Sequence, residues 1–499
     1  MNLEFLQAKD GNKIFCAQGL FYHSKYSPIN EAQRFVDTLS LPFNPKIIFI
    51  IEPGIDYCSS LIRKKFNDCK TAAIRLFQNS QIDKGNFDFV IPFDNQLDFK
   101  QKIISEFGEE ILLSSGIFMW PAAKNIFSQE TSLIFEAFKT AIEECKTILV
   151  TRQFFEKKWL INSLNFINYA NNIVYPNIHE GQIIVVCASG PSLKPCIPII
   201  KNNKKVLFII CLSSATKVLL KNDIKPDLIL TTDGGWYAGQ HLKSLINYND
   251  IPIAAPIEAY IPAMLLKNNP LIPLEYDDSS SFISTSLLQQ SGIKILQARR
   301  NPTVSGTAYY FSKSFNPQKV FFCGLDLAAG KGFSHTKPNE LELNIELSDN
   351  RINTKTKRTV SSLMNSSSLK IYEQWFCTLN NEENKVCRVI DSSKNSLGNI
   401  FDIKSSDFAN YLEEAKTKKT VQLNKMELDK KEIIAACNKT KVYNYVLNQI
   451  EQVKWQKQLF PADFISIENA LDEQKQIAQQ RLNSKVQSLK TKIRKLCGE

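Results

Sequence analysis

Short apolar runs recur between residues 180 and 340, and this recurrence constrains the fold more than any other feature of the sequence. The runs read GQIIVVCA, VLFIICL, DLILTT, IPIAAP and KVFFCGLDL, and helical or turn segments separate them. Strands that are apolar along their whole length are covered on both faces, which is typical of a parallel sheet flanked by helices. The pattern therefore predicts an α/β fold whose central domain contains a mainly parallel sheet.

The rest of the chain has different patterns. At 499 residues it is too long for a single core, so we expect more than one domain. Strand-like runs at Lys46–Ile51 and Phe87–Ile91 accompany helical periodicity at Glu31–Leu39 and Glu130–Cys145, whereas the region beyond residue 400 is mainly helical. We predict an N-terminal α/β domain at 1–150, a central domain at 151–400 and a helical C-terminal domain at 401–499.

The composition limits the partners of the protein. The chain carries 61 basic and 50 acidic residues, a formal net charge of +11. This excess favours anionic partners but is too small for a dedicated nucleic-acid-binding protein. No stretch approaches the roughly eighteen apolar residues of a membrane span, and the first residues, MNLEFLQAKDGNK, lack the order of a signal peptide. We therefore expect a cytoplasmic protein that binds no nucleic acid and is not inserted in a membrane.

The 12 cysteines are scattered along the chain, with no C-x-x-C pair and no cluster with histidine. Cys187, Cys211 and Cys323 lie in the apolar runs, where a small thiol suits a buried position. The sequence predicts reduced core cysteines and no metal site at these residues. No tightly bound cofactor is expected, and a role for Mg²⁺ is left open.

The stretch CASGPSLKP, residues 187–195, follows the first apolar run and precedes a helical segment. Ligands of open α/β sheets bind at the carboxyl ends of the strands, and a small-residue turn that enters a helix leaves backbone N–H groups for a phosphate. Gly190 would let a ligand approach the backbone. Ser189 and Ser192 would either donate to phosphate oxygens or cap the helix, and the turn alone does not decide between these roles.

Two further apolar runs end in polar residues. Asp233 stands before two glycines in KPDLILTTDGG, where it could hold a ribose hydroxyl, a metal ion or a basic side chain, or simply cap a turn. Asp326 stands just past KVFFCGLDL, and His335 follows nine residues later on a glycine-rich loop. A histidine at the expected ligand edge is a candidate acid or base, and a solvated loop histidine is the alternative.

The segment NPTVSGTAYYFSK has the Thr/Ser/Gly pattern of a helix start and directly follows Arg299 and Arg300. A helix N-terminus beside two arginines predicts a second anion site. Two anion sites fit a nucleotide that is joined to an acidic sugar.

The order of these motifs, CASGPSL, IKPDLILTTDGG and PTVSGTAYYFSKSFNPQKVFFCGLDLAAGKGFSH, resembles the central domain of the motility accessory factors (Maf), bacterial proteins that glycosylate flagellin. The stretches FYHSKYSPINEAQRFV and KIIFIIEPG are similar to the first domain of that family. The resemblance implies a Rossmann-like central sheet, similar to that of bacterial sialyltransferases. It also implies transfer of a nonulosonic acid, of pseudaminic or legionaminic type, from its CMP form to Ser or Thr of flagellin, a step needed for flagellum assembly and motility.

The resemblance also implies roles for individual residues. The implied donor-nucleotide residues are Ser189, Gly190, Pro191, Ser192, Asp233 and Gly234. The implied sugar or phosphate residues are Thr303, Ser305, Gly306 and Thr307, and the implied catalytic pair is Asp326 and His335. The family's first-domain strand usually runs into a glycine-rich turn, whereas EPGIDY keeps only Gly54, which argues against a second nucleotide site there.

The end of the chain, residues 474–499, carries seven Lys or Arg against one Glu and has apolar residues at helical spacing. Such a helix can pack on its own protein, lie on a membrane or bind a partner, and the sparse apolar residues make the membrane the weakest option. Because a protein acceptor needs a grip larger than one hydroxyl, we predict that this helix docks flagellin.

Two other function classes stay open. A pterin pyrophosphokinase has a similar Gly-Pro-Ser-Leu turn, but it needs a pocket for a flat ring and Mg²⁺ held by carboxylates. The long first domain and the helical tail argue against it. A non-catalytic flagellin-binding protein would keep the fold and lose the loops, so the joint presence of SGPS, TTDGG and GLDLAAGKGFSH argues against that class.

Overall fold

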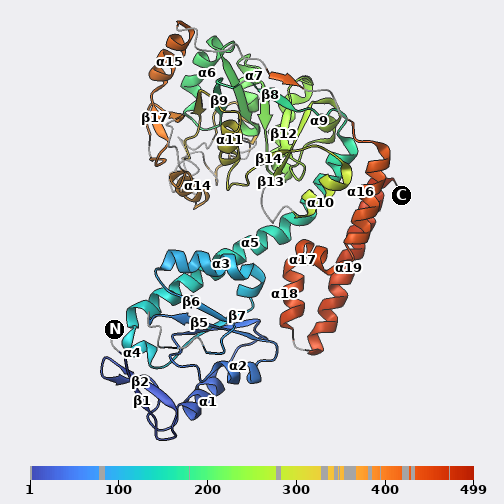
Figure 1. Cartoon of the computed structure of the whole chain (residues 1–499). Helices are drawn as coiled ribbons and strands as arrows, with labels where there is room; N and C mark the ends of the chain where they lie inside the picture. The colour runs from blue at the N-terminus through green and yellow to red at the C-terminus, as the bar shows by residue number, and fades with distance from the viewer. Residues whose placement is uncertain are drawn as a thin grey trace. The chain divides into compact units, whose positions relative to one another are not determined.

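The protein is described by a computed structural model, whose helices and strands are drawn in Figure 1. The described residues are 3–77, 82, 85–178, 180–276, 282–327, 335–341, 347, 349–352, 354, 367–379, 385–393, 395–417, 426–428, 433–470 and 472–498. The chain forms two compact units, the first made of Met1–Glu156 and Ile450–Lys492 and the second of Lys157–Gln449 and Ile493–Glu499. This division differs from the three predicted domains, because residues 401–499 are shared between the two units.

The second unit is built on a nine-stranded sheet in which every ladder is parallel. In spatial order its strands are β14 (Leu296–Ala298), β13 (Leu271–Tyr276), β12 (Ile253–Pro256), β11 (Leu228–Leu230), β10 (Leu207–Leu212), β9 (Ile183–Cys187), β15 (Lys319–Cys323), β16 (Val386–Val389) and β17 (Phe401–Ile403). All residues of β9 and β10 are buried, as their uniformly apolar sequences require. The predicted α/β class with a parallel central sheet is confirmed.

The order of these strands creates a topological switch point. From β9 the chain adds β10 to β14 on one side of the sheet, and it then returns to place β15, β16 and β17 on the other side. The loops that follow β9 and β15 therefore leave the sheet in opposite directions. In doubly wound folds the crevice between two such strands, at their carboxyl ends, is where ligands bind.

Helices connect the strands of the second unit. They are α6 (Leu193–Asn202), α7 (Thr216–Lys221), α8 (Trp236–Gln240), α9 (Ala263–Asn268), α10 (Phe282–Ser291), α11 (Val304–Lys313), α14 (Ser367–Cys377), α15 (Ser405–Thr417) and α16 (Ala436–Gln449), with 3-10 turns η1 (Ser213–Ala215) and η2 (Lys243–Asn247). A short antiparallel pair joins β8 (Pro176–Ile178) to β18 (Met426–Leu428). The segment SSLKIYEQWFC forms α14.

The cysteines of the sheet lie where the sequence predicted. Cys187 is in register with Cys211 on β10 and with Cys323 on β15, and all three are buried and free. Burial raises the pKa of each of these thiols, to about 12 for Cys211. They therefore serve as small apolar side chains that fill the sheet just below its carboxyl edge.

The first unit has its own parallel sheet. Its strands, in spatial order, are β6 (Phe89–Pro92), β5 (Lys70–Arg75), β4 (Ile47–Ile51) and β7 (Ser115–Met119), and an antiparallel sheet adds β1 (Leu3–Gln7), β2 (Lys13–Ala17) and β3 (Leu20–Phe21). Its N-terminal helices are α1 (Pro28–Thr38), α2 (Ser59–Lys65), α3 (Gln96–Leu112), α4 (Ala123–Ile126) and the start of α5 (Ser128–Tyr169). This unit confirms the predicted N-terminal α/β region.

The switch point of this smaller sheet lies between β4 and β7, and the chain's own side chains fill it. Tyr22 and His23 are each 1% exposed there. The Tyr22 hydroxyl donates to the Glu52 carbonyl (2.8 Å), and the Trp120 indole N–H donates to the Tyr22 carbonyl (3.2 Å). A Cβ on Gly54 would lie 2.6 Å from the His23 ring. The chain's own side chains therefore occupy this edge of the smaller sheet.

The last helices, α17 (Val453–Leu459), α18 (Pro461–Asn469) and most of α19 (Asp472–Cys497), belong to the first unit. The apolar stripe of α19 is buried at Leu482, Val486 and Leu489, whereas Ile477 is 54% exposed. Lys485 and Lys490 pair with Asp463 and Glu451. The stripe thus packs on its own protein, which is one of the options that the sequence left open, and docking of flagellin by the basic residues stays a prediction.

Within the described ranges, no helix combines the length and the apolar character needed to cross a bilayer.

Candidate functional site

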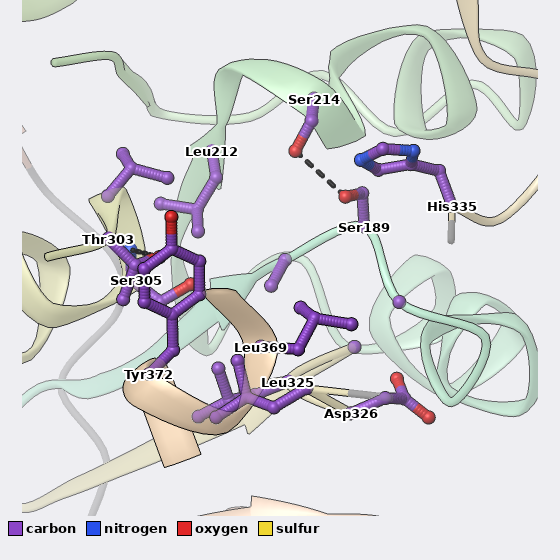
Figure 2. A pocket seen from close by; sticks show the side chains of 15 residues that line it. Ser189, Leu212, Ser214, Thr303, Ser305, Leu325, Asp326, His335, Leu369 and Tyr372 are labelled. Atoms are coloured by element: carbon purple, nitrogen blue, oxygen red, sulfur yellow. Dashed lines mark hydrogen bonds between the residues drawn. The ribbon is translucent and has the colours of Figure 1, made fainter. Parts of the chain in front are cut away.

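A cavity of about 210 Å³ opens at the switch point of the nine-stranded sheet (Figure 2). Its walls come from the loops after β9, β10 and β15, from the start of α11 and from α14. The lining residues are Ala188, Ser189, Gly190, Leu212, Ser214, Thr303, Val304, Ser305, Gly324, Leu325, Asp326, Leu327, His335, Leu369 and Tyr372. The structure therefore brings together Ser189, Gly190, Thr303, Ser305, Asp326 and His335, which the sequence singled out from three separate stretches.

The SGPS turn is closed by internal hydrogen bonds. The Gly190 N–H donates to the Gly324 carbonyl (2.8 Å), and the Leu193 N–H donates to the Gly190 carbonyl (3.0 Å). The Ser192 N–H and hydroxyl both donate to the Asp326 carboxylate, at 3.0 and 2.8 Å. The sequence predicted free N–H groups at this helix start. The structure corrects that prediction, because the carboxylate of Asp326 already occupies the place of an anion.

Asp326 is held firmly in this position. Burial raises the pKa of its carboxyl group, while the bonds from Ser192 and the charge of Arg388 act in the opposite direction. Arg388 is fully buried and forms a two-pronged ion pair with Asp402, with both bonds at 2.7 Å. Its guanidinium also donates to Asn395, whose side chain donates to the Asp326 carbonyl (3.2 Å). This arrangement makes Asp326 a cap of α6, and the hydrogen bonds from Ser192 partly offset the effect of burial on its carboxyl group.

Residues 335–340 bind the ends of β9 and β10 to each other. The Thr336 N–H donates to the Ser189 carbonyl (2.6 Å), and the Asn339 side chain donates to the Ser214 carbonyl (2.8 Å). The Ser214 hydroxyl donates to the Ser189 hydroxyl (2.8 Å), as Figure 2 shows. Because His335 directly precedes Thr336, these bonds fix the backbone from which its imidazole reaches the cavity.

A second histidine lies next to His335. The ring of His241, which follows α8, has its centre 5.9 Å from that of His335. Burial, helped by the nearby His335, lowers the pKa of His241 to about 4, against a smaller opposite effect of Glu340. Glu340 itself pairs with Lys217 (2.5 Å) and accepts a bond from Ser244 (3.1 Å). His241 is therefore an uncharged neighbour of His335 at neutral pH.

The start of α11 forms the opposite wall. Thr303 is its N-cap, and its hydroxyl oxygen accepts from the Ser305 N–H (3.4 Å). Gly306 and Thr307 do not line the cavity. A Cβ on Gly306 would lie 2.8 Å from Asn301 and Trp375, so this glycine permits close packing, and the Thr307 hydroxyl donates to the Arg299 carbonyl (3.3 Å).

The remaining predicted binding residues, Pro191, Ser192, Asp233 and Gly234, also lie outside the lining. Asp233 accepts a hydrogen bond from the Gly235 N–H (2.7 Å), which is the turn-capping role that the sequence left open. A Cβ on Gly234 would lie 2.4 Å from the Trp159 ring.

The two arginines before α11 have partners of their own. Arg300 pairs with the buried Glu258 (2.7 Å) and lies over the Tyr276 ring, and Arg299 lies over the Tyr310 ring. Arg300 is therefore already neutralised by a carboxylate. The helix start of the predicted second anion site is present at α11. The charge of Arg300, which the prediction added to this site, is paired with Glu258 instead.

Sequence reasoning missed Ser214, Tyr372 and His241. Ser214 stands two residues after the end of an apolar run, and a search for hydroxyls just past each run would have found it as it found Ser189. Tyr372 lies on a helix far along the chain, and His241 lies beyond the TTDGG motif, so neither carries a local signal. Within the described ranges, no group of three or more His, Cys, Asp or Glu side chains is arranged to hold a metal ion.

The sheet order and the cavity at its switch point define the class: this is an α/β protein with a doubly wound, Rossmann-like unit. Comparisons with known proteins narrow this class. Residues 158–332 match the family model "6-hydroxymethylpterin diphosphokinase MptE-like". An uncharacterised protein of Treponema pallidum (strain Nichols) is 25% identical over 313 residues, which are 62% of this chain and 67% of that protein.

A solved structure extends the likeness to nearly the whole chain. The Maf glycosyltransferase from Magnetospirillum magneticum AMB-1 has a similar fold, with a TM-score of 0.60 and 10% identity. The match covers 99% of this chain and 92% of the other. The Maf resemblance that the motifs indicated is confirmed in the fold, and it includes the first unit and the C-terminal helices.

Proposed function

We propose that the protein is a glycosyltransferase that uses a nucleotide-activated sugar, and that the cavity at the switch point is its donor site. The observation that carries the proposal is the convergence of the SGPS turn, the TVSGT helix start and His335 on this one cavity. The fold similarity to a Maf glycosyltransferase supports the same reading. Because the motifs resemble those of the Maf family, we propose a CMP-nonulosonic acid as the donor and Ser or Thr of flagellin, modified in the cytoplasm, as the acceptor.

The proposed transfer reaction has two parts, the departure of the phosphate from the sugar and the attack of the acceptor hydroxyl. The bond between C2 of the sugar and the phosphate oxygen breaks, and its electron pair leaves on the phosphate. Hydroxyls and the positive end of α11, at Thr303 and Ser305, are suited to stabilise that phosphate. The acceptor oxygen then bonds to C2 while His335 takes its proton. His241, with a pKa of about 4, does not compete for this proton at neutral pH.

Asp326 has a different role in this proposal. Its carboxylate accepts hydrogen bonds from Ser192 and stands over Gly190, whose Cβ position is 2.1 Å from Oδ2. A group engaged in this way is a poor acceptor of a substrate proton. We therefore assign Asp326 to positioning the turn and His335 to the proton transfer.

The second candidate function is that of a pterin pyrophosphokinase, because the matching family model is described as a 6-hydroxymethylpterin diphosphokinase. That reaction needs Mg²⁺ held by carboxylates. Among the described residues that line the cavity, the only carboxylate is Asp326, and it is committed to Ser192. The site therefore favours the glycosyltransferase.

The test measures release of CMP from a CMP-nonulosonic acid, with and without flagellin, by the purified full-length protein. Wild type should release CMP, and His335→Asn should lower the transfer rate with little change in CMP affinity. His241→Asn serves as the matched control, because this histidine lies outside the cavity lining. Formation of AMP from ATP and 6-hydroxymethylpterin, without CMP release, would assign the site to the kinase instead.

A further inference from the structure

Two serine hydroxyls form a pair at the wall of the cavity, and only one of them belongs to the SGPS motif. Ser189 follows β9, and Ser214 lies in η1, which follows β10. The Ser214 hydroxyl donates to the Ser189 hydroxyl at 2.8 Å (Figure 2). A hydroxyl has one hydrogen and two lone pairs, so a bond between two hydroxyls uses one hydrogen and leaves the pair a second one for another acceptor. Among the described residues, none accepts it.

The pair is fixed before any ligand arrives. Its two backbone carbonyls accept from Thr336 and Asn339, which are 7% and 3% exposed. Ser189 is itself 8% exposed, so protein atoms surround most of this residue. A hydroxyl held in this way donates to an anion without a further loss of side-chain entropy.

The start of α6 offers no comparable place for an anion. The Ser192 N–H and hydroxyl are taken by Asp326, and Ser192 does not line the cavity. A phosphate placed there would meet a carboxylate. The start of α11, by contrast, faces the same cavity as the serine pair through Thr303 and Ser305.

We propose that Ser189 and Ser214, together with the start of α11, form the phosphate subsite of the cavity, and that Ser192 is not part of it. The Ser189 hydroxyl donates to a phosphate oxygen, and Ser214 orients that hydroxyl and adds its own dipole. The identity of the phosphate as that of a nucleotide rests on the proposed function. The subsite itself rests on the geometry of the two hydroxyls.

The experiment measures the affinity of the full-length protein for CMP, cytidine and inorganic phosphate by calorimetry. Loss of one hydrogen bond to a charged group weakens binding by about tenfold or more. Ser189→Ala should therefore weaken CMP binding by about tenfold or more, Ser214→Ala, which removes the orienting bond, should weaken it by a smaller factor, and both should leave cytidine binding unchanged. Ser213→Ala is the matched control, because this serine precedes Ser214 and does not line the cavity.

The possible results separate the two proposals. Phosphate binding that depends on Ser214, without any binding of CMP, keeps the subsite and refutes the nucleotide donor. Equal wild-type affinity for CMP and cytidine, or no binding of any of the three probes, overturns the subsite. A loss of CMP binding in Ser192→Ala but not in Ser214→Ala would return the phosphate to the start of α6.

Discussion

Replacing Gly190 by alanine should destabilise the second unit, because no room exists for a single methyl group. A Cβ at this position would lie 2.1 Å from Oδ2 of Asp326 and 2.6 Å from the Gly324 carbonyl oxygen. The φ of Gly190 lies outside the left-handed region, so its backbone conformation would not oppose alanine. Steric overlap is therefore the obstacle to this substitution. The Gly324 carbonyl oxygen belongs to the backbone just after β15, so it cannot move away by a side-chain rotation.

The size of the effect follows from the bonds that must shift. They are the bond from the Gly190 N–H to the Gly324 carbonyl, and the two from Ser192 to the Asp326 carboxylate. A neutral buried bond contributes about 1 kcal/mol and a bond to a charged group about 1.5 to 3 kcal/mol. Partial loss of these bonds predicts a destabilisation of about 3 to 5 kcal/mol, which lowers the melting temperature by about 10 °C.

Thermal and urea unfolding of Gly190→Ala measure this loss. Gly235→Ala is the control, because the nearest atom to its Cβ is the exposed carboxylate of Asp233 at 3.2 Å. In an Asp326→Ala background the same glycine substitution should cost at least about 1 kcal/mol less, since one of the two clashes is gone. Wild-type stability of Gly190→Ala, or full additivity of the pair, would refute the reasoning.

Three further outcomes are expected in unfolding experiments. His23 and His241 have folded-state pKa values of about 3 and 4, against 6.5 in the unfolded chain. The free energy of unfolding should therefore fall as the pH drops from 6.5 toward 4, by up to about 1.4 kcal/mol per pH unit for each histidine. The variant His241→Phe should make this pH dependence less steep. Leu482→Ala should cost about 2 to 5 kcal/mol and the exposed Ile477→Ala less than about 0.5, whereas equal costs would contradict the packing of α19. Arg388→Met should cost about 3 kcal/mol, because it leaves Asp402 without its partner, and a neutral result would show that the ion pair contributes little.

Much of the candidate site could be predicted because a parallel sheet gathers the carboxyl ends of its strands at one edge. Ser189, Asp326 and Thr303 are distant in sequence, yet each closely follows a strand, and the structure places them around one cavity. The apolar runs that became β9, β10, β11, β12 and β15 were equally readable, since both faces of each are covered.

The roles of these residues could not be read in the same way. Asp326 caps α6 only because β15 lies beside β9, and strand order is a property of the whole sheet. When the strand order is unknown, a carboxylate that follows a strand is as consistent with catalysis as with capping a helix. The location of α19 has the same cause, because an apolar stripe indicates a buried face and does not identify the surface that covers it.

The filled edge of the smaller sheet disfavours the binding of a free ligand there. Tyr22 and His23 are tethered to the same chain as the strands that they cover, so their effective concentration at that edge is far above that of any free molecule. A solute would have to displace an occupant that never diffuses away. A donor nucleotide bound at the second unit's cavity, as proposed, should raise the unfolding temperature of that unit, and the filled edge of the smaller sheet offers it no equivalent place.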